Sequence, residues 1–334
     1  MQPETFHETH LAGRPIRELG LSIAGTQLEP VVAEFLGEVE RLGLPVRPRP
    51  YLSTEWGVPF GTVAIAIPFY LARPELTALH AERTGFVEGT SRGDILRYLR
   101  HEHGHVVNYA YKLYEREAWI ETFGPITQPY RERYAPKPFS RDFVRHLPGW
   151  YAQKHPDEDW AETFAVWMRP GRDWRREYRS WKGALAKLRF TDRLMAALRK
   201  EQPLVTAEDL DEDVGELEVS VEDLYGPAGE EREAPPGFDG ALRTLFDEEG
   251  EDPADPRPAA DLLRRLAREL APVVYRWTGH FPEHTTRLVR QMARRAEVLE
   301  LTYAAAREAE VAREATVLVA ALAMNHVQSG SYLS

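Results

Sequence analysis

Two histidines and a glutamate occur at a spacing that suits metal chemistry. His101, Glu102 and His105 form the pattern His-Glu-x-x-His. Four residues advance an α-helix by about 400°, so both histidines would project from nearly the same side, one turn apart. Two imidazoles in that arrangement can bind one Zn²⁺, and Glu102 can reach a water on the metal. The spacing predicts a zinc-binding helix; the alternative is a helix with two ordinary core or surface histidines.

The residues around the motif favour a helix. Thr90 or Ser91 can cap its N-terminus, and Asp94 follows Ser91 by three residues. Apolar residues then recur at helical spacing, namely Ile95, Leu99, Val106, Tyr109 and Leu113. We expect a helix from about Gly89 to Trp119. His103 would face away from the other two histidines, as a structural or solvated residue.

A zinc site that hydrolyses bonds needs a third protein ligand in addition to a water. The chain contains no cysteine, which excludes disulfides and thiolate ligands and leaves histidine or a carboxylate. The downstream candidates are His146, His155, Glu158, Asp159 and Glu162.

The most specific candidates are Glu158 and Glu162. Pro156 and the acidic residues that follow it are typical of the first turn of a helix. Glutamates four residues apart share one face of such a helix. One of them can then bind the metal, while the other accepts the N–H of a zinc-bound histidine and fixes its tautomer.

The length of the chain allows more than one structural unit. It has 334 residues, of which 43% are hydrophobic, and we expect two units with a linker. The predicted division is a first domain over residues 1–200 with its core, which contains both motifs, at about 60–170, an acidic linker over 201–257, and a helical domain over 258–334.

The net charge of −11 is concentrated in one segment. Residues 207–256 contain nineteen Asp and Glu against two Arg, so the remainder of the chain is mildly basic. The charge and the Pro and Gly content predict a segment that is mobile or lies across a basic surface, with short ordered pieces at 219–225 and 242–246. An inhibitory role for it, if it crosses the metal site, is a further hypothesis.

Membranes and nucleic acids are not expected partners. The chain has no apolar N-terminal leader and no run approaching eighteen apolar residues, so we expect a soluble cytoplasmic protein. The negative net charge and the lack of a reading motif disfavour nucleic acid.

Other elements can be predicted around the motif. Apolar spacing indicates an amphipathic helix over 26–43, prolines make 45–53 extended, and 62–71 is typical of a strand. Pro68 near the end of that strand suggests a sheet edge that can pair with a peptide, the alternative being ordinary core.

Towards the C-terminus, helices are predicted over 259–277 and, with or without a break, from about 283 to 327. They are a candidate module for partner docking or self-association because they carry several arginines, although such faces are usually only solvated.

The two motifs together resemble gluzincin metallopeptidases. The stretch His155-Pro-x-Glu-Asp-Trp-Ala-Glu-Thr163 is very similar to the end of the core in the bacterial family named "putative zinc-binding metallopeptidase". A more distant similarity is to lethal-factor-like toxins. The resemblance covers roughly residues 60–170, and it implies an α+β, mainly helical, zincin-like domain with a small sheet. The segment after residue 200 and the lack of a cysteine-based zinc module depart from the family, so substrate and regulation do not carry over.

The resemblance also implies roles for individual residues. Glu158 would bind Zn²⁺ with His101 and His105, and Glu162 would support the site from behind. Glu102 would act as general base towards a zinc-activated water, and Tyr151, seven residues before Glu158, would point at the scissile carbonyl. The expected function is a zinc-dependent peptidase acting on a protein or peptide. The alternative is an interaction protein with a structural or inactive zinc site, whose C-terminal helices bind the partner.

Overall fold

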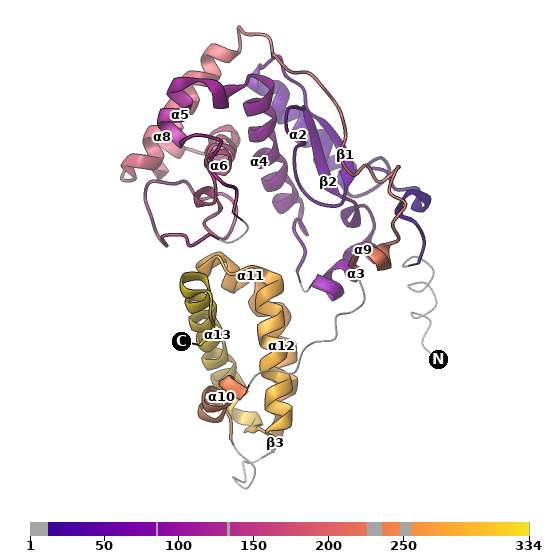
Figure 1. Cartoon of the computed structure of the whole chain (residues 1–334), viewed down its shortest axis with the longest axis vertical. Helices are drawn as coiled ribbons and strands as arrows, with labels where there is room; N and C mark the ends of the chain where they lie inside the picture. Colours follow the sequence, from indigo (N-terminus) through magenta and orange to yellow (C-terminus); the bar gives the residue numbers. More distant parts are fainter. Residues whose placement is uncertain (1–12, 85, 132–133, 226–235, 248–254, 334) are drawn as a thin grey trace. The chain divides into compact units, whose positions relative to one another are not determined.

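The computed structural model describes residues 13–84, 86–131, 134–225, 236–247 and 255–333 (Figure 1). Helices make up 59% of the structure and strands 7%, so the protein is α+β and mainly helical, as expected. The chain divides into two compact units. The first comprises the described parts of residues 1–80, 87–132 and 139–228, and the second those of 81–86, 133–138 and 229–334. The three-part division at residues 200 and 257 stays a prediction.

Helix α2, Leu28–Leu42, is the first long element of the first unit. Its buried face carries Val31, Phe35 and Val39, which follow the predicted helical spacing. Gly43 ends the helix in the left-handed conformation, with φ of 67°. The buried Glu38 of α2 accepts two hydrogen bonds of 2.7 Å from Arg100, which ties α2 to the next long helix.

A small parallel sheet lies beside these helices. Strand β1, Arg49–Ser53, pairs with β2, Ala64–Pro68, with Arg49 opposite Ala64. Strand β2 is shorter than predicted because the chain turns into the 3-10 helix Phe69–Ala72 and then into α3, Pro74–Thr84. The backbone N–H of Ala66 donates to the carbonyl of Gly57 at 2.8 Å, so that position of β2 is not a free edge.

The start of the acidic segment covers the outer face of this sheet. Leu210 packs against Tyr51, Ala64 and Ala66. Backbone hydrogen bonds join Val63 to Ala207 and Leu52 to Val214, at 2.8 and 3.2 Å. Two more backbone hydrogen bonds join Leu217 to Arg17 and Val219 to Ile16, at 3.1 and 3.0 Å. The prediction of a mobile segment is therefore wrong for residues 207–225.

Two surface ion pairs add to that attachment, Arg17–Glu218 and Arg49–Glu208. The two predicted ordered pieces of the segment are confirmed as helices α9, Val221–Tyr225, and α10, Asp239–Leu245. Residues 226–235 and 248–254 lie outside the described residues.

Helix α4, Arg92–Ala110, carries the His-Glu-x-x-His motif. Ser91 caps it as predicted, accepting the backbone N–H of Asp94 at 3.2 Å. The helix ends before the predicted Trp119 because Lys112 takes the left-handed conformation, with φ of 46°. A short 3-10 helix, Leu113–Glu115, and helix α5, Glu117–Phe123, follow.

Helix α6, Pro156–Met168, packs against α4. His155 precedes it as the cap, with its Nδ1 accepting the N–H of Asp157 at 3.2 Å. The short helix α7, Trp174–Glu177, and the longer α8, Lys182–Leu198, complete this unit. Helix α4 thus lies between α6 on one side and α2 and β2 on the other (Figure 1).

The second unit is built mainly from three long helices. These are α11, Ala259–Thr278, α12, Pro282–Val298, and α13, Glu308–Ser329. The predicted helix over 283–327 is broken between α12 and α13, where Thr302–Ala304, strand β4, pairs antiparallel with β3, Pro256–Pro258. Glu300 turns the chain there with φ of 52°.

Several arginines expected on the C-terminal helices pair with acids of their own unit. Arg264 pairs with Glu297, Arg265 with Glu308, and Arg295 with Asp239. These three arginines therefore do not contribute unpaired positive charge to the surface. Within the part of the chain that the structure describes, no helix has both the length and the apolar character needed to cross a bilayer.

Candidate metal centre

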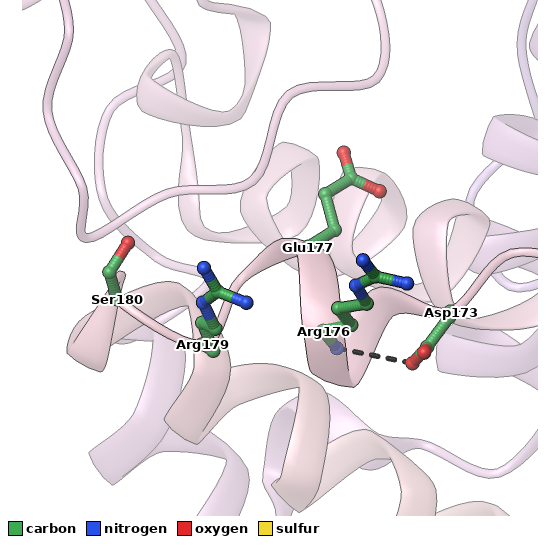
Figure 2. Close-up of a pocket in the computed structure, with 5 residues that line it drawn as sticks. All are labelled: Asp173, Arg176, Glu177, Arg179 and Ser180. Carbon is green, nitrogen blue, oxygen red and sulfur yellow. Dashed lines mark hydrogen bonds between the residues drawn. The ribbon is translucent and has the colours of Figure 1, made fainter.

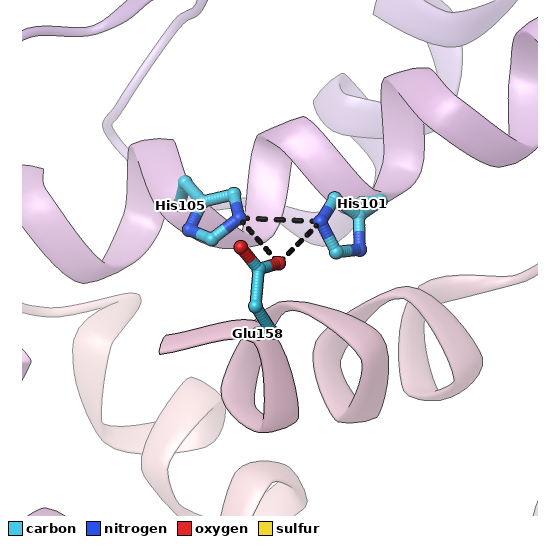
Figure 3. Close-up of side chains that lie close together, drawn as sticks. All are labelled: His101, His105 and Glu158. Carbon is cyan, nitrogen blue, oxygen red and sulfur yellow. Dashed lines mark hydrogen bonds and ion pairs between the residues drawn. The ribbon is translucent and has the colours of Figure 1, made fainter. Parts of the chain in front are cut away.

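Three buried side chains from two helices converge on one point. His101 and His105 project from α4, and Glu158 reaches between them from α6 (Figure 3). Glu158 Oε2 lies 3.0 Å from His101 Nε2 and 3.4 Å from His105 Nε2. The two Nε2 atoms are 3.2 Å apart. Among the described residues, these three are the one set of at least three His, Cys, Asp or Glu side chains whose ligand atoms all lie within 4.8 Å of one another. We call His101, His105 and Glu158 the metal-competent group.

A glycine lets the two helices approach closely enough for this convergence. A Cβ at Gly104 would lie 2.7 Å from the Cα of Ala161, closer than real Cβ atoms come. The Trp160 indole N–H also donates to the Gly104 carbonyl at 2.7 Å. Glycine inside a helix costs roughly 1 kcal/mol relative to alanine, and here close packing of α4 on α6 offsets that cost. Gly104 therefore sets the distance between the histidines and Glu158.

Each histidine is held from behind by a second carboxylate. His101 Nδ1 lies 2.9 Å from Glu162 Oε1, and Glu162 Oε2 accepts the backbone N–H groups of His146 and Leu147 at 3.2 and 2.8 Å. A carboxylate only accepts, so neutral His101 carries its hydrogen on Nδ1 and presents a lone pair on Nε2. Glu162 thus has the geometry of the supporting role that the resemblance implied.

The partner of His105 is Asp157, which sequence reasoning missed. Asp157 Oδ2 lies 3.1 Å from His105 Nδ1 and accepts the Tyr109 hydroxyl at 2.6 Å. The Asn108 amide donates to the other oxygen at 2.7 Å. In the sequence Asp157 was only an acid in the first turn of a helix. The available signal was polar Asn108 and Tyr109, which follow His105 by three and four residues and so share its face.

These carboxylates reverse the effect of burial on the histidines. Burial lowers the pKa of His101, but hydrogen bonds to Glu158 and Glu162 outweigh it and raise the pKa to about 9. Burial likewise opposes the charged form of His105, while Asp157 and Glu158 raise its pKa well above the usual value. The two imidazoles hold the pKa of Glu158 well below its usual range despite burial. The centre therefore favours a carboxylate facing positive charge.

Glu102 is buried next to this group, but its pKa shifts in the opposite direction from that of Glu158. Burial raises the pKa of its carboxyl, and the nearby charges of His101 and His105 counteract that rise only in part. In the described part of the chain no side chain hydrogen-bonds its carboxylate. Glu102 is thus a carboxylate with a raised pKa beside the histidines and with its oxygens uncommitted.

Two tyrosines stand on the Glu158 side of the group. The Tyr151 ring centroid is 5.6 Å from that of His101, and its hydroxyl is 3.3 Å from the hydroxyl of Tyr130. The Tyr130 hydroxyl donates to Glu158 Oε1 at 2.7 Å. Sequence reasoning singled out Tyr151 but not Tyr130, which lies in the irregular loop before α6 and belongs to no motif.

The comparison with protein families bears on these residues. A family model described as "Putative zinc-binding metallo-peptidase" matches residues 78–173. This segment is similar to zinc-binding metallopeptidases. It covers less than a third of the chain but contains α4, α6 and every residue of the group described above. No curated protein and no solved structure matches the chain.

The other candidate ligands have different contacts. His146 Nε2 lies 2.8 Å from the carbonyl of Arg97, and His155 Nε2 lies 3.0 Å from that of Gln128. Asp159 pairs with Lys187 at 2.5 Å. Burial raises the pKa of Asp159 to about 7, although Lys187 lowers it. These three side chains are outside the metal-competent group.

His103 is buried, so the solvated alternative is wrong. Its ring packs edge-on against Phe35 and Phe164, with centroids 5.7 and 5.5 Å away. Neither ring nitrogen has a hydrogen-bond partner in the described structure, and burial lowers the pKa to about 3. His103 is a neutral core residue.

A surface pocket of about 430 Å³ lies around α7 (Figure 2). It is lined by Asp173, Arg176, Glu177, Arg179 and Ser180. All five are exposed, and Asp173 is used to cap the helix at the Arg176 N–H. None belongs to the metal-competent group, so this depression adds nothing to the candidate site.

Proposed function

We propose that the protein is a zinc-dependent peptidase of the gluzincin type, with a zincin-like catalytic domain. His101, His105 and Glu158 would hold the ion. The observation that carries the proposal is the compact set of two imidazoles and one carboxylate within 4.8 Å. The family match over residues 78–173 supports a peptidase and hence a peptide substrate.

The donor set fits zinc. Imidazole nitrogens and a carboxylate oxygen are ordinary zinc ligands. Glu158 Oε2 is buried and faces the Nε2 atoms of both histidines, at 3.0 and 3.4 Å. When both imidazoles are neutral and present lone pairs on Nε2, a cation between the three atoms would offset the cost of burying this carboxylate oxygen.

The number of donors favours catalysis over a structural role. Structural zinc sites have four protein ligands, whereas catalytic sites have three and keep one position for water or substrate. Among the described residues no fourth His, Asp or Glu joins His101, His105 and Glu158. The alternative of an interaction protein with a closed zinc site is therefore the weaker proposal.

When bound, zinc would polarise the substrate carbonyl and lower the pKa of a water towards about 7. Glu102 would take a proton from the attacking water as its oxygen bonds to the carbonyl carbon. As the C–N bond breaks, Glu102 would deliver that proton to the leaving amine. Its raised pKa suits both steps, because a base nearer neutrality also serves as the acid.

The Tyr151 hydroxyl would donate to the carbonyl oxygen as negative charge develops on it. One such donor contributes about 3 kcal/mol to transition-state stabilisation. Glu162 and Asp157 would hold His101 and His105 in the tautomer that points Nε2 at the ion.

The substitution Glu102→Gln tests the proposal. Zinc-loaded wild type and variant would be incubated with a peptide library, and their zinc content measured in parallel. We expect one zinc per chain in both and a loss of turnover of about 10²–10⁴-fold in the variant. Glu117→Gln, on the exposed start of α5, is the matched control and should keep full turnover. Unchanged turnover in Glu102→Gln would refute the general-base role.

A further inference from the structure

The two oxygens of Glu158 have different environments. Oε2 faces His101 and His105, at 3.0 and 3.4 Å from their Nε2 atoms. Oε1 accepts the Tyr130 hydroxyl at 2.7 Å. A carboxylate can bind a cation through one oxygen or through both. A donor already fixed on Oε1 favours binding through Oε2 alone.

We propose that Tyr130 is a positioning residue that restricts Glu158 to one metal-binding oxygen. It would keep the second oxygen out of the metal coordination, so that the remaining position stays available to water and substrate. This inference rests on the proposed metal centre, but it does not require that the protein hydrolyse peptides.

The tether of the Tyr130 loop to α6 supports this role. His155 caps α6 through Nδ1, and its Nε2 lies 3.0 Å from the carbonyl of Gln128. The Tyr130 ring also packs on the ring of His155, with centroids 5.2 Å apart. The same short stretch that places Glu158 therefore also places Tyr130, although Tyr130 is 49% exposed.

A cation adds to the fixation of both tyrosine rings. The Lys154 ammonium lies 4.4 Å from the ring centre of Tyr130 and 5.2 Å from that of Tyr151. A cation within about 6 Å of an aromatic ring is attracted to its face. The Tyr130 hydroxyl has one proton, which goes to Glu158, so it can only accept from Tyr151 at 3.3 Å. In the protein without substrate, the Tyr151 hydroxyl thus donates to Tyr130, and the Tyr130 hydroxyl donates to Glu158.

The test is Tyr130→Phe, which removes the hydroxyl and keeps the ring. Zinc affinity would be measured by chelator competition, and the visible spectrum recorded at saturating Co²⁺. We expect zinc binding to weaken about 10–100-fold, as for loss of other partners of a metal ligand. We also expect weaker Co²⁺ absorption than in the wild type, because a second Glu158 oxygen raises the coordination number.

The matched control is Tyr114→Phe. Tyr114 makes ring contacts to Phe60 and Tyr109, at 5.5 and 6.4 Å, and lies outside the metal-competent group. The zinc affinity and the Co²⁺ spectrum of Tyr114→Phe should equal those of the wild type. A saturated spectrum does not depend on affinity or on overall stability, so a wild-type Co²⁺ spectrum in Tyr130→Phe would overturn the inference. Failure of the wild type itself to bind zinc would instead overturn the proposed metal centre.

Discussion

The two units each contain a group of histidines, and the two groups differ in their surroundings. In the first unit His101 and His105 face Glu158. In the second, the rings of His280, His284 and His326 lie 5.3 to 6.4 Å apart. Although the second group has one more histidine, only the first meets the distance requirement for a shared metal ion among the described residues.

The contacts of His280 explain the difference. Its Nδ1 lies 2.8 Å from the Thr285 hydroxyl and its Nε2 lies 3.0 Å from that of Tyr332. Burial, together with His326 and His284, lowers its pKa to about 3. Hydroxyl partners satisfy a neutral imidazole, whereas carboxylates favour positive charge. Histidines that lie close together are therefore insufficient for a metal site. The feature that distinguishes the first group is the carboxylate of Glu158.

The largest expected effect comes from removing that carboxylate. Glu158→Ala takes away a direct ligand, so zinc affinity should fall by more than the roughly 10–100-fold typical of losing a supporting partner. His326→Ala, in the second unit, should leave zinc affinity unchanged. Chelator competition measures both. Equal zinc affinities for Glu158→Ala and the wild type, or a loss of affinity in His326→Ala, would contradict the assignment of the metal site to the first unit.

The smaller effect is an opposite response to pH in the metal-free protein. His101 has a raised pKa of about 9, so its contribution to stability is full below about 6.5 and is lost as pH rises through 9. His280 has a lowered pKa of about 3, so the unfolded chain takes up a proton first and stability falls as pH drops from about 6.5 towards 3. NMR titration of the imidazole signals should give two midpoints on opposite sides of 6.5.

Zinc should increase the difference between the titrations of His101 and His280. Metal binding requires neutral imidazoles, so it releases protons from His101 and His105 and weakens as pH falls. The His101 titration near pH 9 should disappear on zinc addition, while that of His280 stays. Midpoints near 6.5 for both histidines, with or without zinc, would contradict this electrostatic account.

Local rules were sufficient to predict the elements that carry the candidate site. The Ser91 cap, the apolar spacing of α4 and the acidic start of α6 follow from helix chemistry. Glu158 and Glu162 were singled out by their four-residue spacing. The end of α4 was not predicted, because nothing in the local pattern signals the left-handed Lys112.

Residues that act across long sequence separations were also missed. Tyr130 reaches Glu158 from a loop without periodicity, and Asp157 meets His105 only because α4 and α6 pack closely at Gly104. Charge and composition predict that the acidic residues 207–225 are mobile or lie across a basic surface. Their attachment depends on backbone hydrogen bonds to β1, to Val63 just before β2, and to residues 16 and 17, and composition does not encode those partners.

Zinc K-edge X-ray absorption of the zinc-loaded protein tests the central claim most directly. The account predicts one zinc per chain with two imidazole ligands, one carboxylate oxygen and one further light-atom ligand, and loss of that signal in Glu158→Ala. A zinc bound by three or more imidazoles, or a spectrum unaffected by Glu158→Ala, would place the metal elsewhere and contradict it.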